Sequence, residues 1–454
     1  MFRRLLTPAA LALALAGGAR AESEPVLDAA TLVEPALLSG PGWRVDPRVE
    51  VRGYQARFRI HTDWGELEAD SVELLAVRVA EMPALAALHG AEVDEVVAAA
   101  AKERALHPAN AVGAVAREPV RAVTGLPLGV ARYFGERWQR LRAAVRRLAD
   151  RGRDEVMHEG SPYDQPDGLM GVAGDDRPGR SRGFWKRRGR EVAGLAKQEV
   201  GYPAARRALA ARLGVDPSTR NPLIGPRLDA LAWAETSGRF ATARAIGLVA
   251  GPAGSALSYA VQVNQWVLQE PPEQLRQRNQ ERLGAVCLDD RLVRAFLRDG
   301  AYGPTLQTEL VDLMLRLEPA GGCEALLETA LMATDEPQAR FVVNGLRLLV
   351  ATLRADERRG EFVPQGALLA YRTPAGELVV PLAVDWLAWT PELQRWFGLG
   401  VLADEAPRRL LVSGVVSDLA QREISARGWR LAPPPPYPGE PPYRRGLRLA
   451  RSAP

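Results

Sequence analysis

Two cysteines, Cys287 and Cys323, are the residues whose chemistry could link distant segments covalently. Each lies beside a predicted helix end, where two neighbouring helices could bring the sulfurs together. A disulfide closing this loop of about 37 residues would stabilise the fold by about 4 kcal/mol in the chain-entropy model. Two unpaired thiols in a helical core are the alternative, so the sequence leaves open whether this pair is bonded.

Local motifs of several enzyme classes do not occur in the sequence. The histidines His61, His89, His107 and His158 match neither H-x-x-x-H nor H-E-x-x-H, which argues against a zinc hydrolase of that class. Ser413 lies in VSGVVSD and not in a G-x-S-x-G nucleophile elbow. We therefore predict no cofactor and no metal ion, and we favour a protein without catalytic activity. Catalytic residues assembled from distant segments would leave no such pattern, so an enzyme stays possible.

The N-terminus has the features of a signal peptide. Arg3 and Arg4 precede an apolar run, residues 5–16, that is too short to span a membrane. Ala19-Arg20-Ala21 then fits the small-x-small cleavage pattern. These features predict cleavage after Ala21 and a periplasmic or secreted protein. An uncleaved N-terminal anchor is the alternative.

Residues 206–222, RRALAARLGVDPSTRNP, have the outline of a DNA-binding helix-turn-helix. Asp216 and Pro217 could begin a second helix, but Pro222 would end it after about one turn. A recognition helix must be longer than this to place its side chains in the major groove. We therefore expect a helix from about Pro203 to Leu213, a Gly214 cap, an irregular corner and no nucleic-acid partner.

Charged residues occur in blocks between positions 133 and 190. Residues 133–153 and 177–190 are rich in arginine, whereas residues 154–176 carry acids and no lysine or arginine. The basic blocks could bind an anionic envelope polymer or a membrane surface. They could equally be solvated helix faces that the acidic block neutralises. The candidate anion-binding residues are Arg142, Arg146, Arg147, Lys186, Arg187 and Arg188.

Hydrophobic periodicity predicts a mainly α fold. Phe58 and Ile60 alternate with charged residues, which indicates a small N-terminal β-hairpin. Helical spacing and short connections in residues 290–353 predict antiparallel helices. Residues 361–432 show strand–turn–strand and strand–helix–strand patterns. The expected fold is a multi-helix body of antiparallel helices with the hairpin at its N-terminus and an α+β module at its C-terminus.

The same patterns divide the chain into six segments. They are a signal peptide (1–21), the N-terminal hairpin and helices (22–153), a flexible acidic loop (154–181), a helical domain (182–360), the small α+β module (361–432) and a Pro/Arg-rich tail (433–454).

Three stretches together resemble a set of exported bacterial proteins with no assigned activity. They are ELLAVRVAEMPALAAL (73–88), VTGLPLGVARYFG (123–135) and YPAARRALAARLGVDPSTRNPLI (202–224). The resemblance implies a shared helical fold and export, and it implies no catalytic residue and no cofactor.

The sequence as a whole therefore predicts an exported cell-envelope protein with a binding or structural role, which contacts anionic envelope components through its arginine-rich region. Its protein partners are not indicated. The alternative is a periplasmic hydrolase that acts on an envelope polymer. A deep cleft with converging acidic, histidine or serine side chains would favour the hydrolase, and a helical body with a basic face would favour binding.

Overall fold

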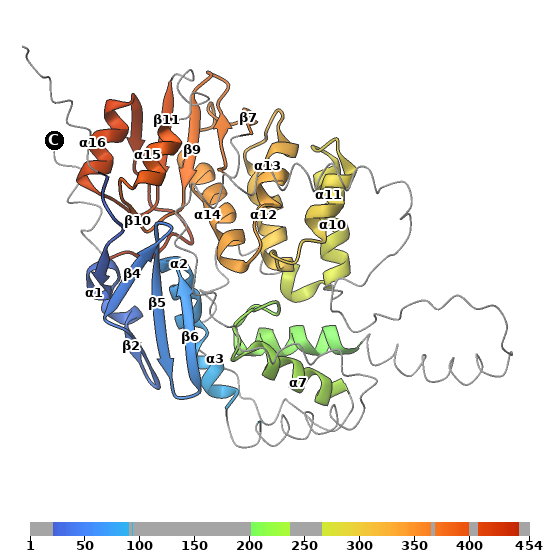
Figure 1. The fold of residues 1–454 in the computed structure, drawn as a ribbon. Helices are drawn as coiled ribbons and strands as arrows, with labels where there is room; N and C mark the ends of the chain where they lie inside the picture. Colours follow the sequence, from blue (N-terminus) through green and yellow to red (C-terminus); the bar gives the residue numbers. More distant parts are fainter. Residues whose placement is uncertain are drawn as a thin grey trace, which may run out of the picture.

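The computed structural model of the chain describes residues 21–89, 93, 201–236, 266–364, 368–398 and 407–444. An antiparallel sheet near the N-terminus and a mixed sheet near the C-terminus each pack against helices, and the two parts are stacked on each other (Figure 1). The prediction of a mainly helical body with one small hairpin is therefore wrong. The described residues form three sheets, one of which has six strands.

The N-terminal sheet forms because apolar and charged residues alternate along its strands. In β4, Val49 and Val51 point inward while Arg48, Glu50 and Arg52 face solvent. The expected hairpin is present as β5 and β6, and it belongs to this larger sheet. The strands are β1 (Val26–Asp28), β2 (Ser39–Gly40), β3 (Trp43–Val45), β4 (Arg48–Arg52), β5 (Gln55–Thr62) and β6 (Gly65–Asp70).

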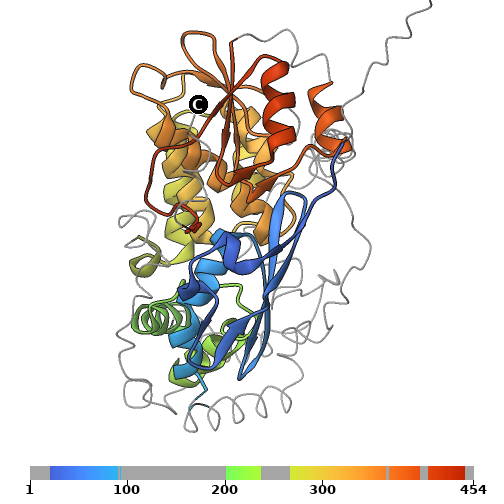
Figure 2. The ribbon, with the colours of Figure 1, turned by 90° about the vertical axis from the view of Figure 1, so that its left-hand side faces the viewer.

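Helices cover the inner face of this sheet, and Figure 2 shows them on one side of the blue strands. Phe58 and Ile60 of the sheet share one apolar core with Leu75, Leu209 and Leu228 of the helices. The helices are α2 (Val72–Ala80), α3 (Met82–Ala87), residues 201–213 and α7 (Gly225–Thr236). The short helix α1 (Ala29–Leu32) and a 3-10 turn (Pro35–Leu37) lie between β1 and β2.

The C-terminal part has helices on both faces of a five-stranded sheet, in the strand order β13-β11-β9-β8-β7. Strands β9, β11 and β13 are parallel. Val379 of β9 faces the core that contains α14, and Val380 faces the core that contains α15 and α16. The strands are β7 (Glu361–Phe362), β8 (Tyr371–Arg372), β9 (Leu378–Leu382), β11 (Arg408–Val412) and β13 (Trp429–Ala432), and β10 (Trp386–Leu387) pairs with β12 (Val415–Val416).

The helices of this part begin where the sequence offers capping residues. Asp289, Asp335, Thr390 and Ser417 each accept a hydrogen bond from the first turn of the helix that follows them. The helices are α10 (Pro272–Gly284), α11 (Asp290–Leu297), α12 (Pro304–Arg316), α13 (Cys323–Ala330), α14 (Glu336–Thr352), α15 (Pro391–Phe397) and α16 (Asp418–Ala426).

Two physical features explain why the sequence did not predict the extent of these sheets. The N-terminal strands other than β5 and β6 have two to five residues, so each shows only one or two periods of alternation. All five residues of β9 are buried because both faces of the sheet are covered. Residues 361–432 show strand patterns that include β9, but a strand buried on both faces reads as a continuous apolar run, which does not indicate how it pairs within a sheet.

Residues 433–444, here called the C-terminal segment, lie against the body of the protein. Tyr437 is part of the core of the C-terminal helices, and Tyr443 is part of the core of the N-terminal sheet. A β-bridge joins Tyr443 to Val33, and the amide of Arg444 donates to the carbonyl of Leu32. The C-terminal segment therefore connects the two parts of the fold.

Candidate functional site

The C-terminal edge of the parallel strands is the first place to search for a site. Ligands of open α/β sheets bind in the crevice beyond the carboxyl ends of the strands. Strand β9 ends at Leu382 and strand β11 at Val412, so Asp385 and Ser413 follow these ends at the same edge of the sheet. Gly414 is required here, because a Cβ at this position would overlap the carbonyl oxygen of Asp385.

Asp385 is 1% exposed and binds three segments that are far apart in the sequence. Its Oδ2 accepts the amide of Ala56 in β5 at 2.9 Å and the amide of Val72 at 3.1 Å. Its Oδ1 accepts the hydroxyl of Tyr443 at 2.7 Å. Val72 is the first residue of α2, so the carboxylate also lies at the positive end of that helix.

Burial raises the pKa of Asp385 to about 6, although the hydrogen bonds from Ala56, Tyr443 and Val72 lower it. Burial and the Asp385 charge raise the pKa of Tyr443 above its usual value, so at neutral pH the tyrosine stays protonated and its hydroxyl donates a hydrogen bond to the carboxylate. A carboxyl group with a pKa near 6 has the acidity of a general acid. In this position its oxygens are held by protein donors, and the group joins β5, α2 and the C-terminal segment.

The tip of the β4–β5 hairpin also covers this edge of the sheet. Gly53 and Tyr54 have φ angles of 60° and 64°, which is the conformation of a two-residue type I′ turn. The carbonyl of Tyr54 accepts the amides of Asp385 and Trp386 at 3.0 and 3.1 Å. The Tyr54 hydroxyl lies 2.6 Å from Oγ1 of Thr390, the N-cap of α15. The hairpin tip and Tyr443 thus occupy the place where α/β sheets commonly bind a ligand.

A second polar cluster joins the N-terminal helices to the C-terminal helices. We call it the arginine–glutamate chain. Positive and negative side chains alternate in it at hydrogen-bond distances. Glu73 and Arg78 lie on α2, with Glu81 directly after that helix. Glu309 lies on α12, and the other members lie on α14. Its members are Glu81, Arg78, Glu336, Arg340, Glu73, Arg347 and Glu309, in that order of contact.

The carboxylates of this chain differ in how many arginines they contact. Burial raises the pKa of Glu73, but Arg340 and Arg347 outweigh it, so the pKa lies below its usual value. The same balance, with Arg340 and Arg78 as partners, lowers the pKa of Glu336 to about 2. Glu309 contacts Arg347, and there burial prevails and raises its pKa. Glu73 and Glu336 are therefore the carboxylates whose ionised forms stabilise the native state.

The corner in residues 206–222 that resembled a helix-turn-helix is hydrogen-bonded to the arginine–glutamate chain. The helix ends at residue 213, Gly214 has a φ of 68°, and turns occupy the positions where a second helix would begin. The carboxylate of Glu81 accepts the hydroxyl of Thr219 at 2.5 Å and the side-chain amide of Asn221 at 2.9 Å. Thr219 and Asn221 of the corner therefore face the protein interior.

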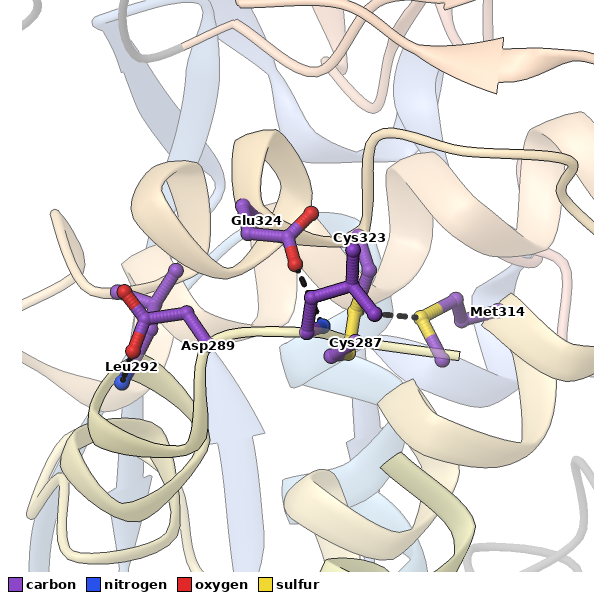
Figure 3. The surroundings of a disulfide bond; sticks show 7 residues. Cys287, Asp289, Leu292, Met314, Cys323 and Glu324 are labelled. Carbon is purple, nitrogen blue, oxygen red and sulfur yellow. Dashed lines mark hydrogen bonds between the residues drawn. A yellow bond between two sulfur atoms is a disulfide. The ribbon is translucent and has the colours of Figure 1, made fainter. Parts of the chain in front are cut away.

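Cys287 and Cys323 form a disulfide, with their Cα atoms 5.3 Å apart. It joins the loop between α10 and α11 to the first residue of α13 (Figure 3). The sulfur of Cys323 lies 3.8 Å from Sδ of Met314, and the amide of the neighbouring Leu288 donates to Glu324 at 2.7 Å. The bonded alternative is thus the correct one for this pair.

The predicted anion-binding residues Arg142, Arg146, Arg147, Lys186, Arg187 and Arg188 lie outside the described residues, as do the predicted acidic loop and the predicted signal peptide up to residue 20. Within the described ranges, no His, Cys, Asp and Glu side chains gather in a group of three that could hold a metal ion. In the same part of the chain, no helix is both long and apolar enough to cross a membrane.

The sequence analysis missed Asp385, Tyr443 and the arginine–glutamate chain. Two signals were present: Asp385 directly follows the apolar run LVVPLAV, and Arg347 lies between leucines of an apolar helix. Buried charges in such places need partners, but local sequence does not say which residues supply them. Comparison of the chain with protein-family models, curated proteins and solved structures found no match.

Proposed function

We propose that residues 1–21 direct export of this protein and are then removed. The mature protein acts in the cell envelope in a binding or structural role. The observation that carries the proposal is the Cys287–Cys323 disulfide. Stable disulfides form in oxidising compartments outside the cytosol and are rare inside it. The signal-peptide features of residues 1–21 agree with such a destination.

In this proposal the binding surface is the arginine-rich region that contains Arg142, Arg146, Arg147, Lys186, Arg187 and Arg188. The charges of the described part support this assignment, because many of them are paired within the protein. The arginine–glutamate chain is buried except for Glu336 and Arg340, which are partly buried, and the outer face of the N-terminal sheet carries acids beside its arginines, such as Arg57 with Asp70 at 3.2 Å. The ligand would be anionic, either an envelope polymer or lipid headgroups.

Cosedimentation across a range of salt concentrations tests this role. The purified protein is mixed with isolated envelope polymer, with vesicles containing anionic phospholipid, or with uncharged phosphatidylcholine vesicles. We expect binding to one of the anionic samples that weakens as salt is raised, because salt screens exposed charges. Which anionic sample binds identifies the ligand class.

Two triple variants complete the test. Replacing Lys186, Arg187 and Arg188 by Gln should abolish binding. The matched control replaces three exposed arginines, Arg291 and Arg294 of α11 and Arg298 at its C-cap, and should leave binding unchanged. Binding that is unaffected by salt, or lost equally in both variants, contradicts the arginine-rich surface. Finding the protein in the cytosol with residues 1–21 still attached contradicts export.

A further inference from the structure

The first described residues of the chain reach the C-terminal module, and Figure 1 shows them in dark blue below α16. Ala21 is exposed, and the residue after it, Glu22, contacts the body of the protein. The backbone nitrogen of Glu22 donates to the carbonyl of Trp389 at 2.9 Å. The amide of Trp389 in turn donates to Oε1 of Glu22 at 2.6 Å. Glu22 therefore binds both backbone groups of one residue.

Ser417 provides the third contact of Glu22. Its hydroxyl accepts the amide of Ala420 at 3.1 Å as the N-cap of α16, and it donates to Oε1 of Glu22. A serine hydroxyl has one hydrogen to donate, and a carboxylate is its strongest acceptor. The Glu22 carboxylate thus completes the hydrogen bonding at the start of α16.

The position of Glu22 coincides with the predicted cleavage site. Hydrolysis of the Ala21–Glu22 peptide bond consumes one water molecule, leaves a carboxylate on Ala21 and an ammonium group on Glu22. That ammonium group would lie where the Glu22 amide now donates to Trp389. A cation in this position makes a charge-assisted hydrogen bond to the carbonyl, which is stronger than the bond from a neutral amide.

We propose that cleavage after Ala21 creates an amino terminus that docks on the C-terminal module, with the ammonium group and the carboxylate of Glu22 both bound at Trp389 and Ser417. We call this contact the N-terminal latch. In the latch, the first residue of the mature chain binds Trp389 and Ser417 of the C-terminal module. The inference rests on the proposed export, since only an exported chain loses residues 1–21.

The latch is tested on the full-length protein produced in an export-competent host. Intact-mass measurement of the purified protein should show a chain that begins at Glu22. Hydrogen exchange followed by mass spectrometry should show protection of the Trp389 amide. In Glu22→Ala this protection should fall about tenfold, because a hydrogen bond to a charged group is lost. The melting temperature should fall by about 2–4 °C.

Glu68→Ala is the matched control, because Glu68 is an exposed glutamate of β6 in the N-terminal sheet and has no hydrogen bond to Trp389 or Ser417. It should leave both readouts unchanged. Ser417→Ala also removes the cap of α16, so it is combined with Glu22→Ala in a double-mutant cycle. Coupling of the two changes separates the latch from loss of the cap, because independent changes would simply add.

The outcomes distinguish this inference from the proposed function. Unchanged protection of Trp389 in Glu22→Ala, or additive effects in the cycle, overturns the latch and leaves export intact. An exported chain that begins at another residue overturns the docked ammonium group and also leaves export intact. A chain that stays in the cytosol with residues 1–21 attached overturns the proposed function itself.

Discussion

Glu73 and Arg340 lie 2.9 Å apart, although 267 positions separate them in the sequence. Glu73 belongs to α2 and Arg340 to α14, so this contact joins the N-terminal sheet and its helices to the C-terminal helices. The same arginine also contacts Glu336 at 2.8 Å. Arg340 is therefore the central cation of the arginine–glutamate chain, with Glu73 on one side and Glu336 on the other.

Replacing this arginine should be strongly destabilising. Arg340→Met keeps the length of the side chain but leaves Glu73 and Glu336 each short of one arginine partner. Breaking a buried ion pair in this way costs about 3–5 kcal/mol. Urea denaturation measures the loss. Arg395→Met is the control, because the Arg395–Glu392 pair is exposed and its loss should cost less than about 1 kcal/mol.

Acid should destabilise the protein through the same cluster. The pKa of Glu336 is about 2 and that of Glu73 is lowered, both from an ordinary value of 4.5. A carboxyl group whose pKa is lowered by folding stabilises the native state above its ordinary pKa, and loses that contribution as pH falls towards the native value. Stability should therefore decrease from about pH 4.5 towards pH 2. Arg340→Met should show a smaller decrease, and an equal one would refute this origin of the acid sensitivity.

Asp385 should act in the opposite direction. Its pKa is raised from 3.8 to about 6, so the folded state binds its proton more tightly than the unfolded chain does. This group therefore favours folding most below pH 4, and its contribution decreases as pH rises to about 6. Asp385→Asn does not titrate, so it should gain up to about 3 kcal/mol relative to the wild-type protein between pH 4 and pH 7. A stability difference that does not change with pH would contradict a raised pKa.

The Tyr443 hydroxyl should hold the C-terminal segment in place. Tyr443→Phe keeps the ring in its core and removes the donor to Asp385, which should cost about 1–3 kcal/mol. Hydrogen exchange should increase at Ala56 and Val72, whose amides share the same carboxylate. If the two side chains interact, Tyr443→Phe should destabilise the Asp385→Asn variant less than it destabilises the wild-type protein. An equal loss of stability in both proteins would show that the effect does not come from the Tyr443–Asp385 hydrogen bond.

The disulfide should contribute a measurable share of the stability. Replacing Cys287 and Cys323 by alanine should cost about 4 kcal/mol, because the unfolded chain regains the freedom that the closed loop removes. Addition of a reductant should lower the melting temperature of the wild-type protein and leave that of the double variant unchanged. Equal melting temperatures of the wild-type protein with and without reductant would show that the bond does not stabilise the fold.

Helix limits in the C-terminal part follow from residues that are close together in the sequence. Helix α11 begins directly after its cap Asp289 and α12 begins at Pro304, and both lie in the stretch 290–353 for which helical spacing predicts antiparallel helices. Pro222 predicted that no recognition helix would form, and turns are found at that position. Capping and proline effects operate within one helical turn, so a local pattern is enough to predict them.

The sheets and the buried clusters were decided by contacts between distant segments. Strand β5 pairs with three other strands, and β9 is buried because helices from both sides of it in the sequence cover its faces. Asp385 meets Tyr443, and Arg340 meets Glu73, only after the chain has folded. The sequence by itself determined the helix ends, the presence of two cysteines and the features that predict export. Tertiary structure alone decided which charges are paired and which strands are neighbours, because the energy of these contacts depends on burial that no local pattern encodes.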